Sequence, residues 1–146
     1  PKNRIWAQSN HFQDSDLSVS ISLATVPWKK SYFSGYIVGV QHRDTLYRFT
    51  PYRKSKITHL RYNETFLEWH LKSGGVEIQF NVERGTKSGL LYAPDEKDMI
   101  PKVAEYLDGK INCKLIVNGE CILEDQTDKA ALEIIGDIKT LIESVK

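Results

Sequence analysis

The amino-acid sequence predicts an all-β fold, an antiparallel meander barrel of about ten strands that ends in one helix. Apolar and polar residues alternate with a period of two through most of the chain, as in Val76–Val82. Tight-turn dipeptides such as Asn118-Gly119 separate these alternating segments. Helical spacing is clear only after Asp137, a natural N-cap residue, where Ile138 and Leu141 begin an apolar face.

Composition indicates a single domain that covers residues 1–146. The 146 residues include 20 Lys and Arg against 19 Asp and Glu, 40% are hydrophobic and 27% are charged. These proportions exclude a disordered charged tail, and no stretch is apolar enough for a spanning helix. The chain opens at Pro1 with neither an initiator Met nor a signal sequence, so we expect it to be a piece of a longer protein.

The alternating segments predict strands that pair in successive hairpins. The predicted strands are Arg4–Ser9, Leu17–Leu23, Gly35–His42, Thr45–Thr50, Lys56–Tyr62, Thr65–Leu71, Val76–Val82, Gly89–Ala93, Lys110–Val117, Glu120–Thr127 and Ala130–Ile135. One segment breaks the pattern. In Asp98–Gly109 the sequence predicts a short helix or an irregular crossing, because Pro101 would lie near the first helical position and Gly109 would end the helix.

Turn lengths predict which side chains share a face. A two-residue turn at Asn63-Glu64 would set Leu60 opposite Leu67, with Trp69 inside the barrel and His70 outside. In the preceding hairpin, a two-residue turn at Arg43-Asp44 would set Val40 opposite Tyr47 and Val38 opposite Phe49. Such a face lines either a packed core or a pocket.

Three serines, Ser18, Ser20 and Ser22, alternate with apolar residues on one predicted strand. If they point inward, their small side chains leave volume for a ligand. If they point outward, they form an ordinary wet surface. Both alternatives are open at the level of sequence.

The two cysteines are predicted to be free thiols. A two-residue turn at Asn118-Gly119 pairs Ile116 with Cys121 and Cys113 with Glu124, so the thiols lie on opposite faces of the hairpin. That arrangement is beyond disulfide geometry. Free thiols favour a reducing compartment, and we expect a cytoplasmic location.

Charge is balanced overall but not locally. The stretch His42–Tyr62 carries six Lys and Arg against one acid, whereas residues 95–146 carry twelve acids against seven Lys. A basic, aromatic-rich stretch is one hypothesis for a surface that binds nucleic acid or an acidic partner, with the barrel as scaffold. The alternation within it favours an ordinary solvated sheet face, so nucleic acid is the weaker expectation.

Common catalytic motifs are absent from the sequence. There is no phosphate-binding Gly loop, Gly-x-Ser-x-Gly or Cys-x-x-Cys, and the four His fall on separate segments, so neither a metal site nor a cofactor is expected. Glu133, His42 and His11 are the candidates for a general acid whose pKa is shifted by an apolar barrel. Each also has a plain structural explanation, Glu133 as the solvent face of a strand and His42 as a turn residue.

Four segments resemble, in order and spacing, the C-terminal half of tocopherol cyclase-like proteins. They are Leu17–Pro27, Gly39–His42, Leu46–Tyr52 and Ala130–Gly136. The resemblance implies a lipocalin-like (calycin-type) barrel, preceded in the whole protein by an N-terminal half. In the plant enzymes, a prenylated quinol is closed to a chromanol by proton addition to a double bond and capture of the cation by the phenol oxygen, with no redox cofactor or metal.

That activity implies a lipophilic small-molecule ligand in a deep apolar cavity with an acid on one side. Glu133 in the closing motif is then the first candidate for the acid, followed by His42 and His11. Aromatic walls would stabilise the cation. The candidate ligand-binding residues are Trp6, Asn10, Trp28, Tyr36, Tyr47 and Trp69. The expected partners are the lipophile and the N-terminal half, and pairing with a second copy of the chain stays open.

Overall fold

The structure is a computed structural model that describes residues 3–86, 88–94 and 99–146; the side chains of Trp28 and of residues 88–104 lie outside the described part. Within these described residues, ten strands, one 3₁₀ helix and one α-helix follow one another. They are β1 (Asn3–Ser9), β2 (Leu17–Trp28), β3 (Ser31–His42), β4 (Thr45–Phe49), η1 (Pro51–Arg53), β5 (Lys56–Tyr62), β6 (Phe66–Ser73), β7 (Val76–Glu83), β8 (Ser88–Pro94), β9 (Met99–Val117), β10 (Glu120–Ile135) and α1 (Ile138–Val145).

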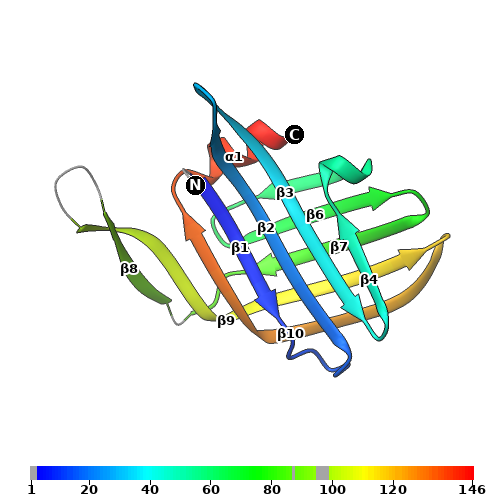
Figure 1. The fold of residues 1–146 in the computed structure, drawn as a ribbon. Coiled ribbons are helices and arrows are strands. Elements are labelled where there is room, and N and C mark those ends of the chain that lie inside the picture. Colours follow the sequence, from blue (N-terminus) through cyan, green and yellow to red (C-terminus); the bar gives the residue numbers. More distant parts are fainter. Residues whose placement is uncertain (1–2, 87, 95–98) are drawn as a thin grey trace.

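The strands form one antiparallel sheet in the order β4-β3-β2-β1-β10-β9-β7-β6-β5, with β8 paired to β9. Figure 1 shows the sheet curled, so that β1–β4 lie in front and cross β5–β7 behind them. The order begins with β4 and ends with β5, so these are the edge strands of the described sheet. The predicted all-β, barrel-like antiparallel fold with a C-terminal helix is confirmed.

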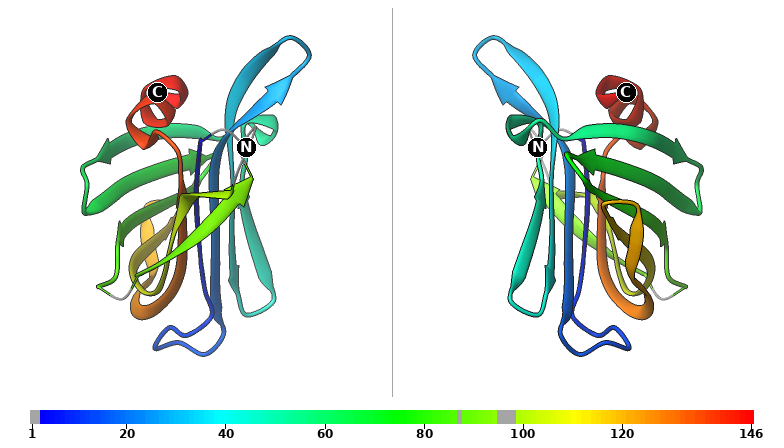
Figure 2. Two further views of the ribbon diagram at one scale, coloured as in Figure 1. Left: turned by 90° about the vertical axis from the view of Figure 1, so that its left-hand side faces the viewer. Right: turned by 90° about the vertical axis from the view of Figure 1, so that its right-hand side faces the viewer.

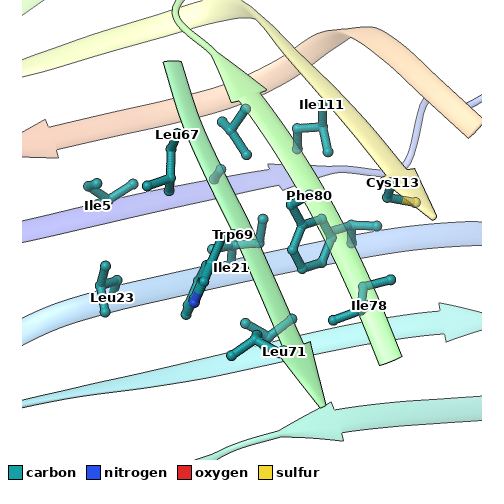
Figure 3. Packing of buried hydrophobic residues seen from close by; sticks show 14 of the residues in the cluster. Ile5, Ile21, Leu23, Leu67, Trp69, Leu71, Ile78, Phe80, Ile111 and Cys113 are labelled. Carbon is teal, nitrogen blue, oxygen red and sulfur yellow. The ribbon is translucent and has the colours of Figure 1, made fainter. Parts of the chain in front are cut away.

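The core lies between the two halves of the curled sheet. Ile21 and Leu23 of β2 meet Trp69 of β6 and Phe80 of β7 across this space (Figure 3). Twelve of the largest core side chains are less than 2% exposed, Trp69 among them. A side chain that bordered a water-sized void would keep accessible surface, so the barrel interior beside these residues is filled by its own side chains.

The predicted strand faces agree with the structure. Ser18, Ser20 and Ser22 point away from the core, while Leu17 and Val19 on the same strand are buried. The outward alternative for the serines is therefore confirmed. In the β3–β4 hairpin, Val40 pairs with Tyr47 and Val38 with Phe49, as predicted from the two-residue turn.

The β5–β6 register differs from the prediction, whereas Trp69 and His70 lie on their predicted faces. Leu60 pairs with Trp69 rather than with the predicted Leu67, because the turn lies one residue later: the N–H of Asn63 donates to the carbonyl of Phe66 at 3.0 Å and closes the hairpin around Glu64-Thr65. The Asn63 Oδ1 also accepts the N–H of Thr65 at 2.8 Å, which stabilises the turn in this position. From Leu60 to Tyr62 the shift of two residues keeps side chains on their faces, so Trp69 is inside and His70 outside as predicted. A bulge between Ile57 and His59 then sets Ile57 opposite the buried Leu71, on the core face.

The β9–β10 hairpin begins as predicted and then shifts by one. Val117 pairs with Glu120 and Ile116 with Cys121, but a bulge follows and Leu123 pairs with Leu115. Cys113 consequently faces Asp125, and the predicted pairing with Glu124 is wrong. Both thiols are free as predicted, Cys113 buried and Cys121 exposed.

The helix or irregular crossing predicted for Asp98–Gly109 is wrong; Asp98 itself lies outside the described residues. From Met99 onward the segment is the first part of β9, held between β8 on one side and β10 on the other. The register with β8 shifts next to Pro101, where a strand tolerates a residue without an N–H. Pairing on two sides therefore overrides the local helix signals.

The C-terminal helix forms as predicted. Asp137 caps it, because its Oδ1 accepts the N–H of Thr140 at 3.1 Å, and Ile138, Leu141 and Ile142 are buried against the sheet. Figure 2 shows α1 at the same end of the molecule as the β2–β3 hairpin, which extends beyond the rest of the fold. Within the described residues, no helix has the length and apolar character needed to cross a bilayer.

Candidate functional site

The three predicted acids do not lie in the barrel interior. Glu133 of β10 points to the outer face, where its Oε1 lies 3.9 Å from the Nη1 of Arg4. It is opposite Trp6 in the β1–β10 register, and Trp6 is likewise on the outer face, between the buried Ile5 and Ala7. The structure thus brings Glu133 and Trp6 together, but on the face opposite to the core.

His42 and His11 lie at the end of the molecule opposite α1. The Nε2 of His42 is 2.9 Å from the Oδ2 of Asp14, in the loop after β1. The pKa of Asp14 is lowered by hydrogen bonds from the backbone of Asp16 and from the His42 ring. His11 is exposed in the same loop, and its carbonyl accepts the hydroxyl of Thr127 at 2.8 Å.

The predicted ligand-binding aromatics divide between core and surface. Tyr36 and Trp69 are buried and meet edge to face, with ring centroids 5.5 Å apart. Tyr47 packs partly buried against the core, and Asn10 is exposed. Trp28 lies in β2, and its side chain is outside the described part. Among the members of this set whose side chains the structure describes, Tyr36 and Trp69 are in ring contact.

A hollow of about 560 Å³ opens beside Tyr36, and we call it the seam hollow. It lies where the sheet is not closed, between β3, β5 and the last turn of α1. Its lining residues are Ser34, Tyr36, Pro51, Ser55, Ile57, Thr58, His59, Leu60, Ser144, Val145 and Lys146. Apolar side chains and hydroxyl groups thus share one hollow, as in sites for small amphipathic molecules.

Hydroxyl groups gather at the β3 side of the seam hollow. The hydroxyl of Tyr36 donates to the carbonyl of Ser55 at 3.1 Å. Ser34 joins Thr25 and the helix residue Ser144 through hydroxyl contacts of 2.8 Å and 2.6 Å. These bonds fix the edge of β3 against both η1–β5 and α1.

Ser55 carries an unmet hydrogen-bonding group. The residue is 9% exposed, and its Oγ is buried without a hydrogen-bond partner. The Nε1 of Trp69, behind Tyr36, is a second buried donor without a partner. A buried polar group left unpaired costs about 1–3 kcal/mol, so two of them around one tyrosine are unusual in a packed fold.

An imidazole–carboxylate pair borders the seam hollow on the outer face of β5 and β6. The Nε2 of His59 lies 3.0 Å from the Oε2 of Glu68, and that hydrogen bond lowers the pKa of Glu68. The His59 and His70 rings are 4.7 Å apart. The pKa of His70 is lowered mainly by burial and, to a smaller extent, by the neighbouring His59.

Two further hollows lie on polar surface. One, of about 580 Å³, is bordered largely by charged and amide side chains of β6, β7, β9 and β10, including Glu68, Gln79 and Lys114. The other, of about 560 Å³, adjoins the loop after β1 and includes His11. Asn81 Oδ1 is unpaired in the first, but neither hollow combines an apolar wall with a hydroxyl cluster.

The described residues hold no group of three or more His, Cys, Asp or Glu side chains arranged for a metal ion. Cys113 is buried beside Asp125, and burial together with that carboxylate raises the pKa of its thiol to about 12. A thiol with so high a pKa is a poor nucleophile at neutral pH.

Sequence reasoning found Tyr36 but missed Ser55, Ser34 and Ser144. The serines come from a turn, a strand edge and a helix end, and nothing in their local sequence indicates that they converge. Lys54 and Lys56 flank Ser55 and indicate exposure, which is the wrong burial for the serine between them. Only the tertiary fold reveals this cluster.

Comparison with known proteins adds no relative: no family model, curated protein or solved structure matches the chain.

Proposed function

We propose that the protein binds a small amphipathic molecule, an apolar body with a hydroxyl or phenol head, in the seam hollow. The observation that carries the proposal is the buried, unpartnered Oγ of Ser55 beside Tyr36 in a hollow of about 560 Å³. That volume is within the range of about 300–1,000 Å³ that is usual for small-molecule sites.

The chemistry of the walls defines the ligand. Ile57, Leu60 and Val145 offer apolar contact, and a turn of Ser55 about its one side-chain bond would bring its hydroxyl to the ligand's polar head. Tyr36 donates to the Ser55 carbonyl and keeps its oxygen lone pairs as acceptors. The resemblance to tocopherol cyclase-like proteins supports the same class, a prenylated phenol.

The proposal is limited to binding and does not include cyclisation. Closing a prenylated quinol needs a strong proton donor at the ligand's double bond. Glu133, His42 and His11 all lie away from the seam hollow. The titratable side chains that line it are Tyr36, His59 and Lys146, and none is a carboxylic acid.

No observation favours the basic stretch as a second function. Arg43 lies at the β3–β4 turn, whereas Arg53 and Lys54 follow β4 at its other end. The positive charges of His42–Tyr62 are therefore distributed over both ends of β4 rather than gathered on one surface.

Titration calorimetry with geranylhydroquinone tests the proposal. We expect saturable binding that weakens about fivefold in Ser55→Ala, the loss of about one hydrogen bond. The dimethyl ether of the same compound can accept but not donate a hydrogen bond, so it should bind the parent more weakly than the quinol does. Ser18→Ala, an exposed serine on the outer face, is the matched control and should bind as the parent does. Equal affinity of the parent and Ser55→Ala for the quinol would refute the proposal.

A further inference from the structure

The β2–β3 hairpin carries exposed aromatic residues and lysines at its tip. Strand pairing continues to Trp28 and Ser31, and Lys29 and Lys30 form the turn. Figure 2 shows this hairpin extending beyond the rest of the molecule. Tyr32 is 57% exposed and Phe33 is 43% exposed.

Apolar residues lie on both faces of this two-stranded ribbon. Phe33 pairs with Val26 on the outer face, where its ring lies over Gly35. Tyr32 pairs with the exposed Pro27 on the other face. A partner that touches one side of the ribbon, such as a nucleic-acid groove, would leave the other side's apolar surface in water, whereas a bilayer interface surrounds both.

The charged side chains of the β2–β3 hairpin are all positive. The sequence holds no Asp or Glu between Leu17 and Arg43, so Lys29 and Lys30 are not offset by a carboxylate of their own hairpin. At the same end of the molecule, η1 presents Tyr52, 89% exposed, beside Arg53 and Lys54. Aromatic side chains with Lys and Arg are the residues that settle at the headgroup level of anionic membranes.

We infer that the β2–β3 hairpin docks the protein on a bilayer that contains anionic lipid, with Tyr32 and Phe33 at the interface and Lys29 and Lys30 at the headgroups. Depth is limited by the backbone. The outer edges of a two-stranded ribbon keep unpaired N–H and carbonyl groups, which are costly in hydrocarbon, so the tip stays in the headgroup region. This inference does not rest on the seam hollow and stands or falls separately.

Vesicle co-sedimentation tests the inference with the full chain. We expect binding to phosphatidylcholine vesicles that contain phosphatidylserine, weaker binding to pure phosphatidylcholine, and a decrease with added salt. Lys29→Asn with Lys30→Gln should weaken binding about fivefold per lysine removed. Asn suits position 29, where φ is 56°.

The aromatic contribution needs its own variants. Tyr32→Ser with Phe33→Ser should reduce binding to both kinds of vesicle, and near-UV circular dichroism would verify that the fold is retained. The controls are Lys72→Gln with Lys129→Gln for charge, and Ile122→Ser, 43% exposed at another hairpin, for apolar surface.

Three outcomes would overturn the inference. They are failure to sediment with either vesicle, an equal loss in the control variants, or retention of a single-stranded oligonucleotide that depends on Lys29 and Lys30 while vesicles do not bind. The last result would assign the hairpin to nucleic acid instead.

Discussion

At the scale of single residues, the two cysteines show how burial controls reactivity. Cys121 is exposed, whereas Cys113 is buried with its thiol pKa raised to about 12. We predict that a thiol-reactive disulfide reagent at mildly alkaline pH labels one cysteine in the folded protein and two in denaturant. Cys121→Ser should abolish labelling of the folded protein. Rapid labelling of that variant would contradict the burial of Cys113.

Ser55 and Tyr36 allow a second test at this scale, since the Oγ of Ser55 has no hydrogen-bond partner whereas the hydroxyl of Tyr36 has one. Ser55→Ala removes a buried hydroxyl without a partner, so the free energy of unfolding should stay the same or rise by up to about 1 kcal/mol. Tyr36→Phe removes the 3.1 Å bond to the Ser55 carbonyl and should lower it by about 1 kcal/mol. Urea unfolding measures both, and an equal loss in the two variants would contradict the assignment.

The residue scale also shows a limit of sequence reasoning. Glu133 has an apolar neighbour on either side and belongs to the motif that carries the family resemblance, yet its carboxylate faces Arg4 on the outer surface. Alternation with Leu132 and Ile134 predicts the solvent face for Glu133, whereas the family resemblance favoured a cavity-facing acid. The plain alternative, a solvent-facing residue, describes it.

At the scale of elements, α1 depends on its cap. Asp137 accepts the Thr140 N–H at 3.1 Å and the Thr140 hydroxyl at 2.7 Å, and its own N–H donates to the Oδ1 of Asn3. Asp137→Ala should therefore lower the Tm by a few degrees through loss of the side-chain cap. Lys139→Ala, exposed on the same helix, is the control, and an equal fall in both Tm values would show that the cap contributes nothing.

The outer face of β5–β7 gives stability a pH dependence. Burial and His59 hold the pKa of His70 below its ordinary 6.5, although Glu77 and Glu68 oppose that shift. Between the folded-state and unfolded-state pKa values of His70, the unfolded chain binds more protons than the folded one. The contribution of neutral His70 to the free energy of unfolding is therefore complete above pH 6.5 and is lost as pH falls through the folded-state pKa. His70→Gln should flatten the fall in urea midpoint just below pH 6.5. An unchanged slope would contradict the burial effect.

Elements were predictable from the sequence where local chemistry decides them. The Arg43-Asp44 turn fixed the β3–β4 register, and period-two alternation predicted the core faces of β2, β6 and β7. The errors occur where the decision is not local. The bulge after Cys121 and a turn that lies one residue later than predicted, at Glu64-Thr65, shift the registers. The β9 strand is extended only because β8 and β10 pair with it.

At the scale of the whole molecule, the curling of one sheet explains both why its own described side chains fill the barrel interior and why a hollow opens at the edge of the sheet. The resemblance implied a deep apolar cavity, but Trp69, Phe80 and Phe49 fill the space between the two halves. The unclosed edge beside β3 and β5 leaves the seam hollow instead. Sequence reasoning could not predict this filled interior. Whether the core side chains fill the barrel depends on the angle and distance at which its two halves cross, which the sequence alone does not give.

Both proposals concern the same end of the molecule, where α1, η1 and the β2–β3 hairpin gather (Figures 1 and 2). A hairpin docked at a bilayer would hold the seam hollow near the source of a lipophilic ligand. Each proposal nevertheless has its own residues, Ser55 and Tyr36 for the ligand, Lys29 and Lys30 for the membrane, so each can fail alone.

The most direct test of the central claim is to locate the ligand by isotope-filtered NMR, with unlabelled geranylhydroquinone and the labelled full chain. The seam hollow predicts intermolecular NOEs from the geranyl methyl groups to Ile57, Leu60 and Val145, and from the quinol ring to Tyr36. NOEs to interior residues such as Ile21 and Phe80, or none at a saturating concentration, would contradict the account.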